Sequence, residues 1–166
     1  MRRIIACLAA LAVLAGCALD TQESLKKQLS ARLYILEVMH FTSKSSCTAA
    51  VFTLAVGAFR KPYPQARSID SALERIRGQN QVQFALDGLS PNEITEAIMS
   101  RDLPHGLGLI SAGIGPARDC MDARIARGYH RVLLSPLSQM VYLPQDNALL
   151  ILYPPEKLAF FLRGNV

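Results

Sequence analysis

The chain has 166 residues, of which 51% are hydrophobic and 19% are charged, and its formal net charge is +5 at pH 7. This composition excludes an intrinsically disordered chain, and the length is enough for one domain with a hydrophobic core. The positive excess is too small to indicate nucleic acid as a partner, because it falls to +3 once Arg2 and Arg3 are set aside.

The first residues have the layout of a secretory signal. Arg2 and Arg3 make a positive start, residues 4–15 are apolar, and small residues lead to Cys17. The uncharged run over residues 4–19 has 16 residues, fewer than the about 20 that a membrane-spanning helix needs. The pattern therefore predicts a cleaved signal rather than a permanent membrane span.

The stretch Leu14-Ala15-Gly16-Cys17 resembles the lipobox of bacterial lipoproteins, in which an aliphatic residue and two small residues precede a cysteine. The resemblance covers only residues 1–17. It implies that the Cys17 thiol receives a diacylglycerol, that the chain is cut before Cys17, and that the new amino group is acylated. In such lipoproteins an Asp directly after the cysteine favours the inner membrane. Here that residue is Ala18, so the resemblance implies the outer membrane.

This resemblance divides the chain into three parts. Residues 1–16 are the signal peptide, residues 17–19 are the lipidated N-terminus, and residues 20–166 form a single periplasmic domain. The membrane is then a partner through the lipid, since several acyl chains anchor a protein far better than one. The alternative is a cut after Ala18, which would give a soluble periplasmic protein.

The first helix of the mature chain is predicted from Thr21 to about Phe41. Asp20 and Glu23 have the spacing of a capping box, and leucines recur every three or four residues along the segment.

A second helix is predicted from Cys47 to Phe59, with Ser45 or Ser46 as its N-cap. The segment is almost uncharged, so such a helix should be buried on most sides.

The strongest helix signal is Ser90-Pro91-Asn92-Glu93, which combines an N-cap, a first-turn proline and a Glu at the third position. The elements expected in the middle of the chain are a helix over Ile69–Arg77, a strand over Val82–Leu86, a helix from Pro91 to Arg101, a glycine-rich bend over Leu103–Pro116 with about one helical turn, and a helix over Ala117–Leu134.

The C-terminal part changes character. Short apolar runs near residues 139–143, 148–153 and 158–163 alternate with turn residues, which predicts a three-stranded antiparallel meander. Helices first and strands last predict an α+β fold, with about five helices packed on a small C-terminal antiparallel β-meander in a single domain.

The four cysteines have different expected fates. Cys7 is removed with the signal and Cys17 carries the lipid. In an oxidising compartment the remaining pair, Cys47 and Cys120, is predicted to form a disulfide.

Cys47 also supports a second interpretation. A thiol at the start of a helix is activated by the helix dipole, and His40 is close in sequence as a base. Ser46 is the neighbouring hydroxyl candidate. This alternative is a small membrane-tethered hydrolase, or a ligand-binding domain, with its chemistry near Ser45–Cys47.

Arg124, Arg127 and Arg131 share one face of the helix expected over residues 117–134, where they form a candidate patch for lipid phosphates or an acidic partner. No cofactor and no metal are expected, because the histidines lack the spacing of metal ligands. The main hypothesis is a non-enzymatic, membrane-anchored lipoprotein that faces the periplasm and contacts an envelope protein. The oligomeric state stays open.

Overall fold

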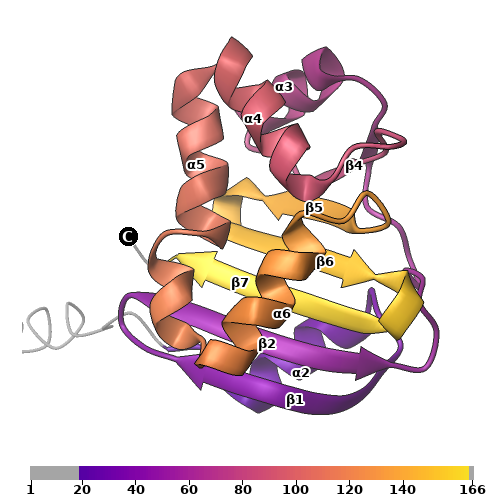
Figure 1. The fold of residues 1–166 in the computed structure, drawn as a ribbon, viewed down its shortest axis with the longest axis vertical. Coiled ribbons are helices and arrows are strands. Elements are labelled where there is room, and N and C mark those ends of the chain that lie inside the picture. Colours follow the sequence, from indigo (N-terminus) through magenta and orange to yellow (C-terminus); the bar gives the residue numbers. More distant parts are fainter. Residues whose placement is uncertain (1–18, 165–166) are drawn as a thin grey trace, which may run out of the picture.

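The computed structural model describes residues 19–164, so the lipobox and Cys17 lie outside the described residues. Its centre is a mixed sheet with the strand order β1-β2-β7-β6-β5-β4-β3, in which only the β3–β4 pair is parallel (Figure 1). The strands are β1 (Ile35–Ser43), β2 (Cys47–Leu54), β3 (Gln65–Ala66), β4 (Val82–Phe84), β5 (Gln139–Leu143), β6 (Ala148–Tyr153) and β7 (Leu158–Gly164).

Helices cover both faces of this sheet. Helix α2 lies on one face, and α3 to α6 with the short 3-10 helix η2 lie on the other (Figure 1). Within residues 19–164, none of the helices is long and apolar enough to cross a membrane. The helices are α2 (Gln22–Ser30), α3 (Ile69–Arg77), α4 (Pro91–Arg101), α5 (Leu103–Gly113) and α6 (Ala123–Leu133), with 3-10 turns η2 (Pro116–Cys120), η3 (Pro144–Asp146) and η4 (Pro154–Glu156).

The predicted fold class is wrong in its architecture. The fold is α+β and the expected meander exists as β5, β6 and β7, but it is the middle of a seven-stranded sheet rather than a small C-terminal unit. Strands β1 and β2 come early in the chain and pair with each other, and β2 also pairs with β7, the last strand. Strand β6 lies inside this sheet, with helices over both faces. A strand covered on both faces buries its side chains on either side, which explains why the β6 sequence is continuously apolar.

The helix predicted from Thr21 to Phe41 ends at Ser30, and after a short turn the chain enters strand β1 at Ile35. Two β-bulges interrupt the pairing of β1 with β2, between Ile35 and Glu37 and between Val38 and His40. As a result Ile35, Val38 and Phe41 all pack on the α2 face at a spacing of three residues. A bulged strand therefore has the apolar spacing of a helix.

The segment 47–59, predicted as a buried helix, contains strand β2 instead. β2 pairs with β1 along one edge and with β7 along the other, and all of its side chains except Thr53 are buried. Cys47, Ala49 and Val51 belong to the core beneath α3 to α6, whereas Ala50, Phe52 and Leu54 belong to the core beneath α2. An uncharged run of this length fits a central strand as well as a buried helix.

Helices α3 and α4 begin and end where the sequence signals indicated. Ser90 and Glu93 form the predicted capping box of α4, and Ser68 with Ser71 forms one at α3. The predicted strand after α3 is confirmed as β4, shortened to Val82–Phe84. These elements carry their own start and stop signals.

The glycine-rich bend predicted over residues 103–116 is mostly helix α5. Its glycines allow close packing: a Cβ on Gly106 would lie 2.6 Å from the Met99 Cα in α4, and one on Gly113 would lie 2.6 Å from the Leu149 side chain in β6. The helix predicted over residues 117–134 is divided into η2 and α6, because Asp122 caps a new helix with hydrogen bonds from the amides of Arg124 and Ile125.

Asp102 connects three helices at one end of the molecule. It follows α4, caps α5, and accepts hydrogen bonds from Arg77 of α3 at 2.9 and 2.7 Å. The His105 ring nitrogen Nδ1 lies 2.7 Å from the same carboxylate. Hydrogen bonding to His105 and then to Arg77 lowers the pKa of Asp102 to about 2.

We expect the free energy of unfolding of Asp102→Asn to fall less steeply in acid than that of the wild type. The pKa of an aspartate in an unfolded chain is about 4, so the stabilisation by the Asp102 carboxylate is complete above pH 4 and is lost as the pH falls toward 2. Denaturant unfolding at a series of pH values should give a flatter curve for the variant in that range. Asp87→Asn, at an exposed turn, is the matched control. A wild-type slope in Asp102→Asn would contradict the prediction.

Candidate functional site

The predicted disulfide between Cys47 and Cys120 is confirmed. It joins the first residue of β2 to the last residue of η2, with the two Cα atoms 6.1 Å apart and both side chains buried. On the chain-entropy model, closing a loop of 73 residues stabilises the fold by about 4 kcal/mol. The disulfide therefore holds η2, and with it the start of α6, against the sheet.

The three predicted catalytic residues, His40, Ser46 and Cys47, do not combine into a nucleophile hydrogen-bonded to a base. Cys47 carries the disulfide, and the His40 Nε2 lies 2.9 Å from the Cys120 carbonyl oxygen. Ser45 and Ser46 form the exposed turn of the β1–β2 hairpin, which Lys44 and Cys47 close with paired backbone hydrogen bonds, so neither serine is a helix cap. The free thiol that the hydrolase alternative requires is thus occupied.

The predicted arginine patch is split by its contacts. Arg131 makes a bidentate ion pair with Glu156, and its guanidinium group lies over the Tyr153 ring. These contacts hold the Arg131 side chain toward η4. Arg124 is exposed near the helix cap. Arg127 lines a shallow hollow on α6 together with Arg118 of η2 and His130. The sequence did not identify Arg118 as a neighbour, because it belongs to a different element.

Asp20 binds the end of the sheet, a role that the sequence did not indicate. Its carboxylate accepts a hydrogen bond from Thr48 of β2 at 2.7 Å and pairs with Arg163 of β7 at 2.5 Å. Both charged side chains are mostly buried. The predicted capping role of Asp20 is wrong, because Thr21 caps α2 with Ser24 as its reciprocal partner. We call the group Asp20, Thr48 and Arg163 the N-terminal clamp.

A cavity of about 140 Å³ lies between the end of α5, η2 and α6. Its walls are almost entirely apolar, and the basic residues Arg118 and His130 are among the exposed residues that line it. The cavity and the hollow beside it share Arg118, Ala126 and His130. The residues that line the cavity are Gly113, Ile114, Arg118, Met121, Ala126, Tyr129, His130 and Leu133.

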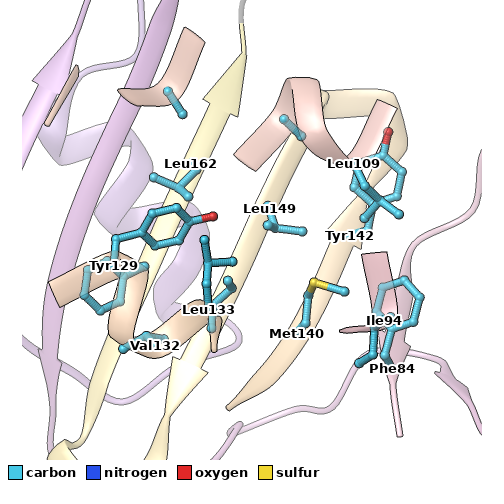
Figure 2. Close-up of a cluster of buried hydrophobic side chains, with 14 of the residues drawn as sticks. Phe84, Ile94, Leu109, Tyr129, Val132, Leu133, Met140, Tyr142, Leu149 and Leu162 are labelled. Atoms are coloured by element: carbon cyan, nitrogen blue, oxygen red, sulfur yellow. The ribbon is translucent and has the colours of Figure 1, made fainter. Parts of the chain in front are cut away.

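Tyr129 is the one polar side chain of the inner wall, and it is only 5% exposed. Its ring packs near Phe160, and its hydroxyl lies among carbon atoms of the leucine-rich core (Figure 2). Among residues 19–164 this hydroxyl has no hydrogen-bond partner, and burial raises its pKa. A buried hydroxyl without a partner is unusual, and this one is closed to a water-sized probe, so it belongs to the core rather than to the cavity surface.

A metal site receives no support from the described part of the chain. No three His, Cys, Asp or Glu side chains of residues 19–164 come close enough to hold a metal ion. Comparison of the whole chain with protein-family models, curated proteins and solved structures found no match. The candidate features are therefore the N-terminal clamp and the cavity beside Tyr129.

We expect Asp20→Ala to lower the free energy of unfolding by about 2 kcal/mol, because it leaves the mostly buried Arg163 without its carboxylate. Asp70→Ala is the matched control, since Asp70 pairs with Arg101 on an exposed surface and should cost less than about 1 kcal/mol. Urea unfolding of both variants measures the difference. Equal losses would show that the clamp stabilises the fold no more than an exposed ion pair does.

Proposed function

We propose that the protein is a lipoprotein anchored to the outer membrane through Cys17, and that its periplasmic domain acts by contacting another envelope protein rather than by catalysis. The proposal begins from the lipobox-like stretch ending at Cys17. The observation that carries it is the N-terminal clamp, because it attaches the chain to the domain directly after the proposed lipid.

The clamp limits the distance between domain and membrane. Only Ala18 and Leu19 separate Cys17 from Asp20, and three residue steps reach at most about 10 Å. Asp20 is held at the start of β2 and the end of β7. The anchored domain would therefore stand with this end of the sheet against the membrane surface, without a long tether.

Strand β1 is the surface that we assign to the protein partner. It lies at the edge of the sheet, where its outer backbone groups face no other strand of residues 19–164. Leu36 and Met39 on this strand are 62% and 44% exposed. An edge strand with exposed apolar residues can accept a strand from a partner. The two bulges and Glu37 oppose pairing of this edge with unrelated strands.

The hydrolase alternative has less support. Its proposed thiol is part of the disulfide, and its proposed base contacts a backbone carbonyl.

The lipid anchor is tested with Cys17→Ala. We expect the intact mass of the mature wild type to equal that of residues 17–166 plus acyl chains, and the protein to fractionate with outer membranes. The variant should carry no acyl mass and should not be cut before residue 17, because the sulfur that accepts the lipid is absent. A wild-type protein without acyl mass would overturn the anchor.

The partner surface is tested with the double variant Leu36→Lys, Met39→Lys. Chemical crosslinking in intact host cells should capture a specific adduct with the wild type, and the variant should give about tenfold less, because charges replace the apolar contacts. The double variant Leu103→Lys, Leu107→Lys is the matched control, since these leucines are similarly exposed on α5. Equal adduct from wild type and the β1 variant would exclude this strand.

A further inference from the structure

We propose that the hollow where β3 and β4 end and β5 begins binds a small zwitterion of dipeptide size, with an ammonium group at one end and a carboxylate at the other. This inference goes beyond the proposed function. It depends on neither the lipid anchor nor strand β1, because it uses only residues of β3, β4 and β5 and of the segments next to them.

The topology of this part of the sheet creates the hollow. β3, α3 and β4 form the one β-α-β unit within residues 19–164, and their two strands are parallel. The carboxyl ends of parallel strands lie at one edge of a sheet, and open α/β sheets bind their ligands outside that edge. The antiparallel strand β5 begins at the same edge with Gln139. The hollow between these strand ends has a volume of about 320 Å³, and most of its wall is polar.

Gln83 of β4 supplies a fixed polar group in the wall of this hollow. The residue is only 7% exposed, and its Oε1 accepts a hydrogen bond from the Tyr63 amide at 3.2 Å. Its Nε2 has no partner within residues 19–164. Solvent still reaches this Nε2, because the side-chain atoms of these residues that are both closed off and without a partner belong to Tyr129 and Arg163. The Nε2 is therefore free to donate a hydrogen bond to a carbonyl oxygen of a ligand.

Two opposite charges stand at the rim. Arg67 follows β3 and Asp87 follows β4, and both line a more open hollow that shares Gln65 and Asp87 with the first. Both charged side chains are exposed, and within residues 19–164 neither forms an ion pair, with the other or with a third residue.

These charges select a zwitterion over an anion. The guanidinium group of an arginine matches a carboxylate with two parallel hydrogen bonds, and an aspartate accepts hydrogen bonds from an ammonium group. A ligand with both groups would satisfy Arg67 and Asp87 together, whereas a simple anion would be repelled by Asp87.

The volume of the hollow sets the size of the ligand. An apolar cavity of about 150 Å³ accommodates a benzene molecule, so about 320 Å³ accommodates roughly twice as many atoms. A dipeptide of small residues, such as L-alanyl-L-alanine, is of this size. The peptide carbonyl between its two charged ends is the acceptor that we assign to the Gln83 Nε2.

The test uses calorimetric titration of the full chain with three probes: L-alanyl-L-alanine, its N-acetyl derivative and its C-terminal amide. We expect the dipeptide to bind with a dissociation constant below about 1 mM. The N-acetyl derivative lacks the ammonium group and the amide lacks the carboxylate, so each should bind about fivefold more weakly. No saturable binding of the dipeptide, or equal binding of all three probes, would overturn the proposal.

Four variants locate the binding. Asp87→Asn should bind the dipeptide and its N-acetyl derivative equally, and Arg67→Gln should bind the dipeptide no better than its amide. Gln83→Glu keeps the acceptor for the Tyr63 amide but removes the donor, so it should weaken binding of all three probes. Arg75→Gln, on α3 but outside both hollows, is the control and should bind as the wild type does. Unchanged selectivity in both Asp87→Asn and Arg67→Gln would place the probe elsewhere and reject the site.

Discussion

The pairing of β2 with β7 is the interaction on which the remaining structure depends. It runs from Cys47 opposite Gly164 to Thr53 opposite Leu158, and it joins an early hairpin to the last strand of the described chain. Without it, the β1–β2 hairpin would have no sheet to extend and α2 would have no continuous apolar face to cover. The N-terminal clamp also requires it, because Thr48 and Arg163 face each other across these two strands.

Local signals predicted the elements that depend on nearby residues, and they failed where distant residues decide. The helix at Pro91–Arg101 has its cap, proline and reciprocal Glu within four positions, and the meander strands are joined by short turns. Strand β2 instead depends on β7, more than 100 residues later, and an uncharged run does not reveal that partner. The bulges of β1 give it a helical spacing, and the glycines of α5 indicate a bend until the close approach to Met99 is known.

The candidate sites follow the same division. Counting cysteines was enough to predict the Cys47–Cys120 pair, because the pairing has one solution once the signal and lipid cysteines are assigned. The salt bridge from Asp20 to Arg163 spans 143 positions, and the cavity combines residues from three elements. No spacing rule in the sequence encodes either of them. Helical periodicity did place Arg124, Arg127 and Arg131 together, yet Glu156 from a distant turn removes Arg131 from that group.

The position of β7 in the middle of the sheet has a consequence for biogenesis. Since β7 joins β2 to β6, the sheet cannot close until residues 158–164 have been synthesised. A nascent chain would expose the facing edges of β2 and β6, and long-range pairing of this kind makes folding slow. For the exported lipoprotein that we propose, slow closure would keep the polypeptide unfolded during passage through a narrow translocation channel.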